Sequence, residues 1–95
     1  ATCLIAYEPV WAISTNPDAR PDTPASAVQS MGLIRETLAD RFDVSAPTFL
    51  YGGSVTPANA EDFLARSEIS GVLVGGASVR VEDFCEILAI TAGAL

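Results

Sequence analysis

The strongest constraint on the fold is a unit that occurs three times: a short apolar run, then a lone carboxylate or a glycine pair, then a segment with helical spacing. The apolar runs are TCLIAY, PTFL and GVLV, at residues 2–7, 47–50 and 71–74. Helix-like segments follow at about residues 24–41, from Thr56 and Pro57 onward, and from about Val81 to Gly93. This alternation predicts an α/β fold whose parallel strands are joined by right-handed crossovers.

Composition limits the size and the partners of the molecule. Ninety-five residues fit one small domain or part of one, and 49% hydrophobic residues with a net charge of -7 describe a globular, acidic chain. The basic residues are scattered: Arg20, Arg35, Arg41, Arg66 and Arg80. Because nucleic acids and anionic membranes attract clustered positive charge, we expect neither as a partner. No apolar stretch approaches the ~18 residues of a membrane span.

The missing residue types and the cysteines narrow the chemistry further. The chain contains no His and no Lys, so it cannot by itself complete a mechanism that needs an imidazole or an ammonium group. Cys3 and Cys85 lie in apolar runs, which predicts buried free thiols and a reducing, cytoplasmic location. The sequence has no metal-ligand spacing, no Walker-type loop and no G-x-G-x-x-G, so we expect no metal and no cofactor.

The unusual residues all follow predicted strands. Glu8 comes after the first strand, Gly52-Gly53-Ser54 after the second, and Gly75-Gly76 after the third. Open doubly wound sheets and (β/α)₈ barrels both bind ligands at the carboxyl ends of their strands, and periodicity alone does not separate the two. The glycine pairs are either plain turns or an anion site, because glycine lets backbone N–H groups approach an anion closely without any Lys or Arg.

Glu8 is either a solvated charge at a strand end or a general base. Pro9 stiffens the chain after it, Trp11 offers a large apolar cover, and Ala12-Ile13 make the following loop apolar. Such a loop is costly to expose unless it closes over something, and closure excludes water, which strengthens a carboxylate as a base. The pattern predicts a lid hinged beside a base, although Trp11 and Tyr51 could equally be core residues.

Three longer motifs resemble the triosephosphate isomerase family. YEPVWAI at residues 7–13 resembles its sixth-strand base and lid, YGGSV at 51–55 its seventh-strand loop, and GVLVGGAS at 71–78 its eighth-strand phosphate loop. The resemblance covers essentially the whole chain. It implies that residues 1–95 are the C-terminal segment of a TIM (β/α)₈ barrel, with three βα units and parallel strands in an incomplete barrel.

The resemblance implies a role for each matching residue. Glu8 is the base. The phosphate-binding positions are Ser14, Ser54, Gly75 and Gly76. The lid and its contacts are Pro9, Val10, Trp11, Ala12, Ile13, Thr15, Tyr51 and Leu73, of which Tyr51, with Ser54, holds the closed lid and Leu73 presses on the base. The segment from Asn16 to Asp22 departs from the family because it is about three residues longer, and Ser14 stands where the lid usually has glycine.

The implied reaction interconverts dihydroxyacetone phosphate and glyceraldehyde 3-phosphate through an enediol, a step of glycolysis and gluconeogenesis. The family takes an Asn and a Lys from its first strand and a His from its fourth, so this chain alone is expected to be inactive. Expected partners are a phosphorylated small sugar and either the missing N-terminal segment, strands one to five, or a second copy, since the family is usually homodimeric. The alternatives are an isomerase segment for four-carbon sugar phosphates and a non-catalytic phosphate-binding or assembly fragment.

Overall fold

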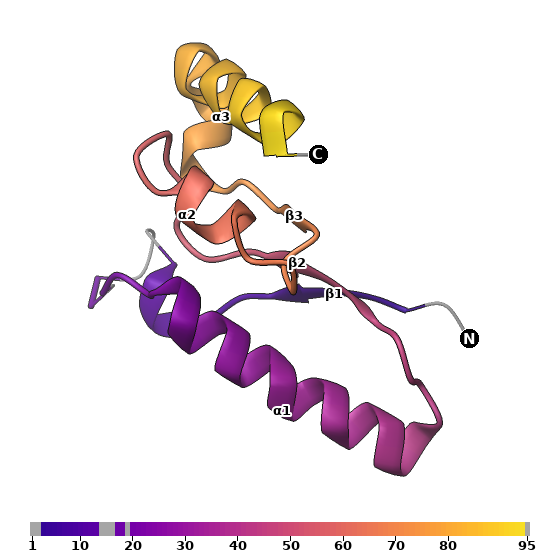
Figure 1. Cartoon of the computed structure of the whole chain (residues 1–95). Helices are drawn as coiled ribbons and strands as arrows, with labels where there is room; N and C mark the ends of the chain where they lie inside the picture. The colour runs from indigo at the N-terminus through magenta and orange to yellow at the C-terminus, as the bar shows by residue number, and fades with distance from the viewer. Residues whose placement is uncertain (1–2, 14–16, 19, 95) are drawn as a thin grey trace.

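A computed structural model describes residues 3–13, 17–18 and 20–94 and contains a parallel sheet in the order β1-β2-β3 (Figure 1). The strands are β1 (Leu4–Tyr7), β2 (Thr48–Tyr51) and β3 (Gly71–Val72). Their register pairs Tyr7 with Tyr51 and Tyr51 with Val72, so all three strands end at nearly the same level. The predicted parallel α/β architecture is confirmed, and the sheet is open rather than closed into a barrel.

Helix α1 (Pro24–Phe42) connects β1 to β2 and lies along one side of the sheet (Figure 1). Thr23 begins it as an N-cap, because its Oγ1 accepts a hydrogen bond from the N–H of Ser26 at 3.1 Å, and Pro24 fits the first helical position, which needs no donor. The helix ends at Asp43, whose left-handed backbone (φ 57°) turns the chain toward β2. The predicted helix at 24–41 is therefore confirmed to within one residue.

Two further helices follow the other strands: α2 (Ala60–Leu64) and α3 (Val81–Ala94). The prediction that the second helix opens at Thr56 and Pro57 was wrong, because residues 57–59 form a turn. The side chain of Asn59 holds this turn, accepting from the N–H of Thr56 at 2.8 Å and donating to the carbonyl of Ser54 at 2.9 Å. A 3₁₀ turn, η2 (Gly76–Val79), leads into α3.

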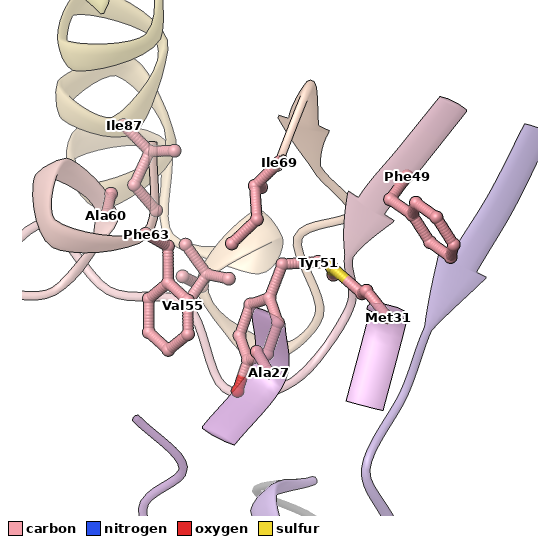
Figure 2. Close-up of a cluster of buried hydrophobic side chains, with 10 residues drawn as sticks. Ala27, Met31, Phe49, Tyr51, Val55, Ala60, Phe63, Ile69 and Ile87 are labelled. Atoms are coloured by element: carbon pink, nitrogen blue, oxygen red, sulfur yellow. The ribbon is translucent and has the colours of Figure 1, made fainter. Parts of the chain in front are cut away.

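The core lies where the helices pack on the sheet (Figure 2). Its buried members are Ala27, Met31, Phe49, Tyr51, Val55, Ala60, Phe63, Ile69, Ala77 and Ile87. The Tyr51 ring stacks on Phe63 with centroids 3.9 Å apart, and the Arg35 guanidinium lies 5.2 Å from the centre of the Phe49 ring. These contacts hold one face of β2, the central strand of the described sheet, against both α1 and α2.

One face of the sheet lacks a cover in the described part of the chain. A short apolar run such as residues 2–7 is typical of a strand that is buried on both faces. That expectation was wrong: Leu4 is 65% exposed and Ala6 is exposed, whereas Ile5 and Tyr7 are half-buried. The reason is that side chains alternate across a strand and the described helices pack on the Ile5 and Tyr7 side. In a closed barrel, the opposite face would point into the barrel interior.

The two cysteines are free thiols, as predicted. Their predicted burial was wrong for Cys85, which is exposed on α3, and Cys3 is half-buried before β1. The outer surface of α3 has no neighbouring element among the described residues that would bury Cys85. None of the described helices is long and apolar enough to cross a membrane.

Candidate functional site

Glu8 is the first residue after β1, and its side chain lies over the backbone of Gly52. The N–H of Gly52 donates to the carbonyl of Tyr7 at 2.7 Å, which extends the strand pairing by one step. A Cβ atom added to Gly52 would lie 2.7 Å from Cγ of Glu8 and 3.3 Å from its Oε1. Glycine at position 52 therefore leaves the space that the exposed Glu8 side chain occupies.

A cavity of about 350 Å³ lies beside Gly52, at the carboxyl end of the strands. Its lining residues are Ile13, Gly52, Gly53, Ser54, Val55, Thr56, Gly75, Gly76, Ala77 and Arg80. Ser54 follows β2, whereas Gly75 and Gly76 follow β3. These three predicted phosphate-binding residues thus line the same cavity although they belong to different loops. Since Gly52 contacts Glu8 and lines the cavity, the carboxylate lies at its edge.

The first part of the predicted lid forms a 3₁₀ turn, η1 (Val10–Ala12), directly after Pro9. The N–H of Ala12 donates to the carbonyl of Pro9 at 2.9 Å, and the carbonyl of Ala12 accepts from the N–H of Ser54 at 2.7 Å. Ser54 therefore connects η1 to the loop after β2. Because its N–H is used in this bond, its hydroxyl is the donor that remains for a ligand. Ile13, the next residue along, lines the cavity.

The rest of the predicted lid is described only in part. Ser14 and Thr15 lie outside the described residues. Beyond them, the N–H of Arg20 donates to the carbonyl of Trp11, which brings the far end of the segment back to its start. The half-buried Trp11 and the exposed Arg20 border a shallow hollow that continues toward Asp22 and the beginning of α1.

Tyr51 is a buried residue of β2 that lies near the end of the lid segment. Its side chain is 1% exposed, stacks on Phe63 and tilts toward the Tyr7 ring at a centroid distance of 6.5 Å. Burial raises the pKa of the Tyr51 phenol above its ordinary value, and the negative charge of Asp22 raises it further. Oδ2 of Asp22 is itself buried with no hydrogen-bond partner among the described residues. Tyr51 is thus both a core residue and a neighbour of the lid segment.

The raised pKa of Tyr51 predicts a loss of stability in alkaline solution. In the unfolded chain the phenol ionises near pH 10, but in the folded chain it keeps its proton to higher pH. The stabilisation that Tyr51 provides through this difference is fully present below about pH 10. Above that pH, the free energy of unfolding falls by up to ~1.4 kcal/mol per pH unit. Urea unfolding between pH 8 and 11.5 should show this extra slope in the native chain and not in Tyr51→Phe. Equal slopes in the two proteins would contradict the prediction.

Leu73 lies outside the cavity. Its N–H donates to the carbonyl of Tyr51 at 2.8 Å, and its side chain is 46% exposed. It borders a separate apolar hollow of about 390 Å³ between β3 and α3, with residues that include Val74, Phe84 and Leu88. No described contact joins Leu73 to Glu8.

The sequence pattern did not single out Arg80, which the structure places on the cavity wall. Arg80 follows η2 and precedes α3, and its Nε donates to Oδ2 of Asp83 at 2.6 Å. Arg80 comes five residues after Gly75, and the turn η2 lies between them. Its place on the cavity wall depends on the direction in which η2 turns the chain, which residue spacing alone does not show. Among the described residues, no group of three His, Cys, Asp or Glu side chains could hold a metal ion.

Two comparisons with known proteins identify the family and the fold. The family model for triosephosphate isomerase matches residues 1–91. Among solved structures, the crystal structure of triosephosphate isomerase from Bartonella henselae is similar at 34% sequence identity, with a TM-score of 0.72 over 94% of this chain. This chain spans 35% of the length of that structure. The family match over almost the whole sequence, together with the shared fold, shows that the chain belongs to the triosephosphate isomerase family.

Proposed function

We propose that this chain forms the part of a triose-phosphate isomerase that holds the base, the lid and the phosphate site. Glu8 removes a proton from the hydroxyl-bearing carbon beside the substrate carbonyl, and the carbonyl oxygen takes up a proton to give an enediol. The same carboxyl group then returns a proton to the former carbonyl carbon, while the oxygen on the first carbon gives up its proton and becomes the new carbonyl. The reaction interconverts dihydroxyacetone phosphate and glyceraldehyde 3-phosphate, and no electrons leave the substrate. No metal or cofactor is required for this step.

One observation carries the proposal: the Glu8 side chain lies against Gly52, and Gly52 lines the same cavity as Gly75 and Gly76. A phosphate group bound by the N–H groups of the glycine pair would leave the carbon chain of a small sugar phosphate in the cavity of about 350 Å³. The carboxylate at the edge of this cavity would then lie beside the carbon atoms that exchange a proton.

The remaining groups of the active site come from other parts of the barrel. The chain has no His and no Lys, so it has neither residue type to stabilise the negative charge that develops on the enediolate oxygens. In the described sheet, β1 and β3 each have a neighbour on one side only, and an apolar hollow with exposed Leu73 and Leu88 lies beside β3. Unpaired strand edges favour association, so we propose that a segment with the first five strands packs there. Self-association of this chain is the competing outcome.

The test is to assay isomerisation of glyceraldehyde 3-phosphate by the chain alone and after mixing with a segment that carries the first five strands of a family member. The chain alone should be inactive and the mixture active. A single-chain fusion of the two pieces removes failed assembly as an explanation for an inactive mixture. Activity of the chain alone would contradict the requirement for partner groups, and an inactive but folded fusion would contradict the proposed function.

The lid segment supports a second substrate class. Residues between Ile13 and Asp22 make this part of the chain longer than is usual in the family, and Ile13 lines the cavity. A longer lid could leave room for one more carbon. The fusion should therefore be assayed with four-carbon sugar phosphates as well, and a higher kcat/KM for a tetrose phosphate than for a triose phosphate would reassign the substrate. Phosphate binding without any turnover would instead favour a non-catalytic module.

A further inference from the structure

The charge on the cavity wall is opposite in sign to that of the whole chain. The chain has a net charge of -7, yet the described lining residues include no carboxylate and one cation, Arg80. The other lining residues are apolar, glycine or hydroxyl-bearing. Arg80 is paired with Asp83, and the Glu8 carboxylate lies at the edge of the cavity, so the contribution of Arg80 is local: it is the one cationic hydrogen-bond donor among the described lining residues.

The backbone and the side chain of Arg80 are both held in place. Its N–H donates to the carbonyl of Ala77 at 3.1 Å, and its carbonyl accepts from the N–H of Phe84 at 2.9 Å, which fixes the residue between η2 and α3. Its Nε donates to Oδ2 of Asp83 at 2.6 Å. Because a guanidinium has five N–H donors, this bond uses one edge and leaves the donors of the terminal nitrogens for a ligand.

We propose that Arg80 binds the phosphate group of the substrate, with Asp83 as its positioning residue. This inference rests on the proposed function, because it adds a guanidinium donor to the phosphate site formed by Gly75, Gly76 and Ser54. Backbone N–H groups bring only partial charges to an anion, whereas a guanidinium adds charge-assisted hydrogen bonds. The Arg80 side chain is 58% exposed, so water and salt weaken the interaction, and we expect a contribution of about three- to tenfold in affinity.

The direct test titrates inorganic phosphate into the 95-residue chain and follows the amide resonances of Gly75, Gly76 and Ser54 by NMR. Arg80→Gln should raise the Kd for phosphate about three- to tenfold, and Arg80→Lys should recover part of the loss. Arg41→Gln is the matched control. It changes the net charge by the same amount, but it lies in the last turn of α1, and no residue of α1 lines the cavity. Its Kd should equal that of the native chain.

The outcomes separate this inference from the proposed function. Equal phosphate affinities in the native chain and Arg80→Gln would overturn the role of Arg80 and leave the glycine site intact. Equal losses in Arg80→Gln and Arg41→Gln would also overturn it, because the effect would then come from net charge. If phosphate shifts none of the three amide resonances in the native chain, both the role of Arg80 and the proposed phosphate site are wrong.

A kinetic test uses the active fusion and compares substrates with and without a phosphate group. Arg80→Gln should raise KM for glyceraldehyde 3-phosphate about three- to tenfold, with a smaller change in kcat. The same variant should process glyceraldehyde, which has no phosphate, at the same kcat/KM as the native fusion. A structural defect would lower activity toward both substrates equally, and that result would contradict phosphate binding by Arg80.

Discussion

Replacing Glu8 with Gln should lower the kcat of the active fusion by about 10²- to 10⁴-fold, the usual contribution of a general base. Glutamine keeps the shape of the side chain that packs over Gly52, but its amide does not accept the substrate proton. KM should change little, because the residues of the proposed phosphate site are untouched. Steady-state kinetics with glyceraldehyde 3-phosphate measures both parameters.

Two further variants sharpen this test. Glu8→Asp keeps the carboxylate but withdraws it by one methylene, and a displacement of that size costs about 10²-fold when a reacting group must be aligned. Glu86→Gln removes the same charge from an exposed position on α3 and should leave kcat unchanged. A loss of less than about tenfold in Glu8→Gln would mean that another group removes the proton.

Gly53→Ala should destabilise the chain by about 1–3 kcal/mol, the range for overfilling a packed core. A Cβ atom at position 53 would lie 2.2 Å from the hydroxyl oxygen of Tyr51 and 2.5 Å from its Cζ. The ring cannot move away easily, because it is buried and stacked on Phe63. Urea unfolding followed by circular dichroism measures the change in the free energy of unfolding.

The matched control is Gly32→Ala in the middle of α1. No heavy atom lies within 4 Å of the position of the added Cβ, so the substitution should raise stability by roughly 0.5–1 kcal/mol through the better helix propensity of alanine. Opposite signs for the two substitutions would show that space beside Tyr51, and not the loss of glycine as such, causes the effect. If Gly53→Ala unfolds at the same urea concentration as the native chain, the packing of Tyr51 over residue 53 is contradicted.

The order of strands and helices could be predicted because each element has a strong local signal. Thr23 and Pro24 mark the beginning of α1, and that boundary is confirmed. The onset of α2 could not be placed from Thr56 and Pro57, because residues 57–59 form a hydrogen-bonded turn and the first regular helical residue is Ala60. The burial of β1 was also wrong, since burial depends on which faces of the sheet are covered.

The candidate site was predictable where residues directly follow strands. Glu8, Ser54 and Gly75 were expected at one edge of the sheet, and the parallel register brings the latter two to one cavity with Glu8 beside it. Arg80 could not be predicted in the same way, because its place on the cavity wall depends on the turn η2 and on a hydrogen bond to Asp83. The structure places the described site residues, but the roles of all of them, and of Ser14 and Thr15, stay predictions.

The three strands end at nearly the same level, so a change of chain length should have a different effect in β1 than in the lid segment. Tyr7, Tyr51 and Val72 are register partners, and the N–H of Gly52 bonds to the carbonyl of Tyr7. One residue inserted into or deleted from β1 would move Glu8 by about 3.3 Å along the sheet and reverse the side to which it points. The described residues of the lid segment, 13, 17–18 and 20–22, lie outside this ladder. Evolution could therefore lengthen the lid without moving the carboxylate, whereas any change of length inside β1 would separate the base from the cavity.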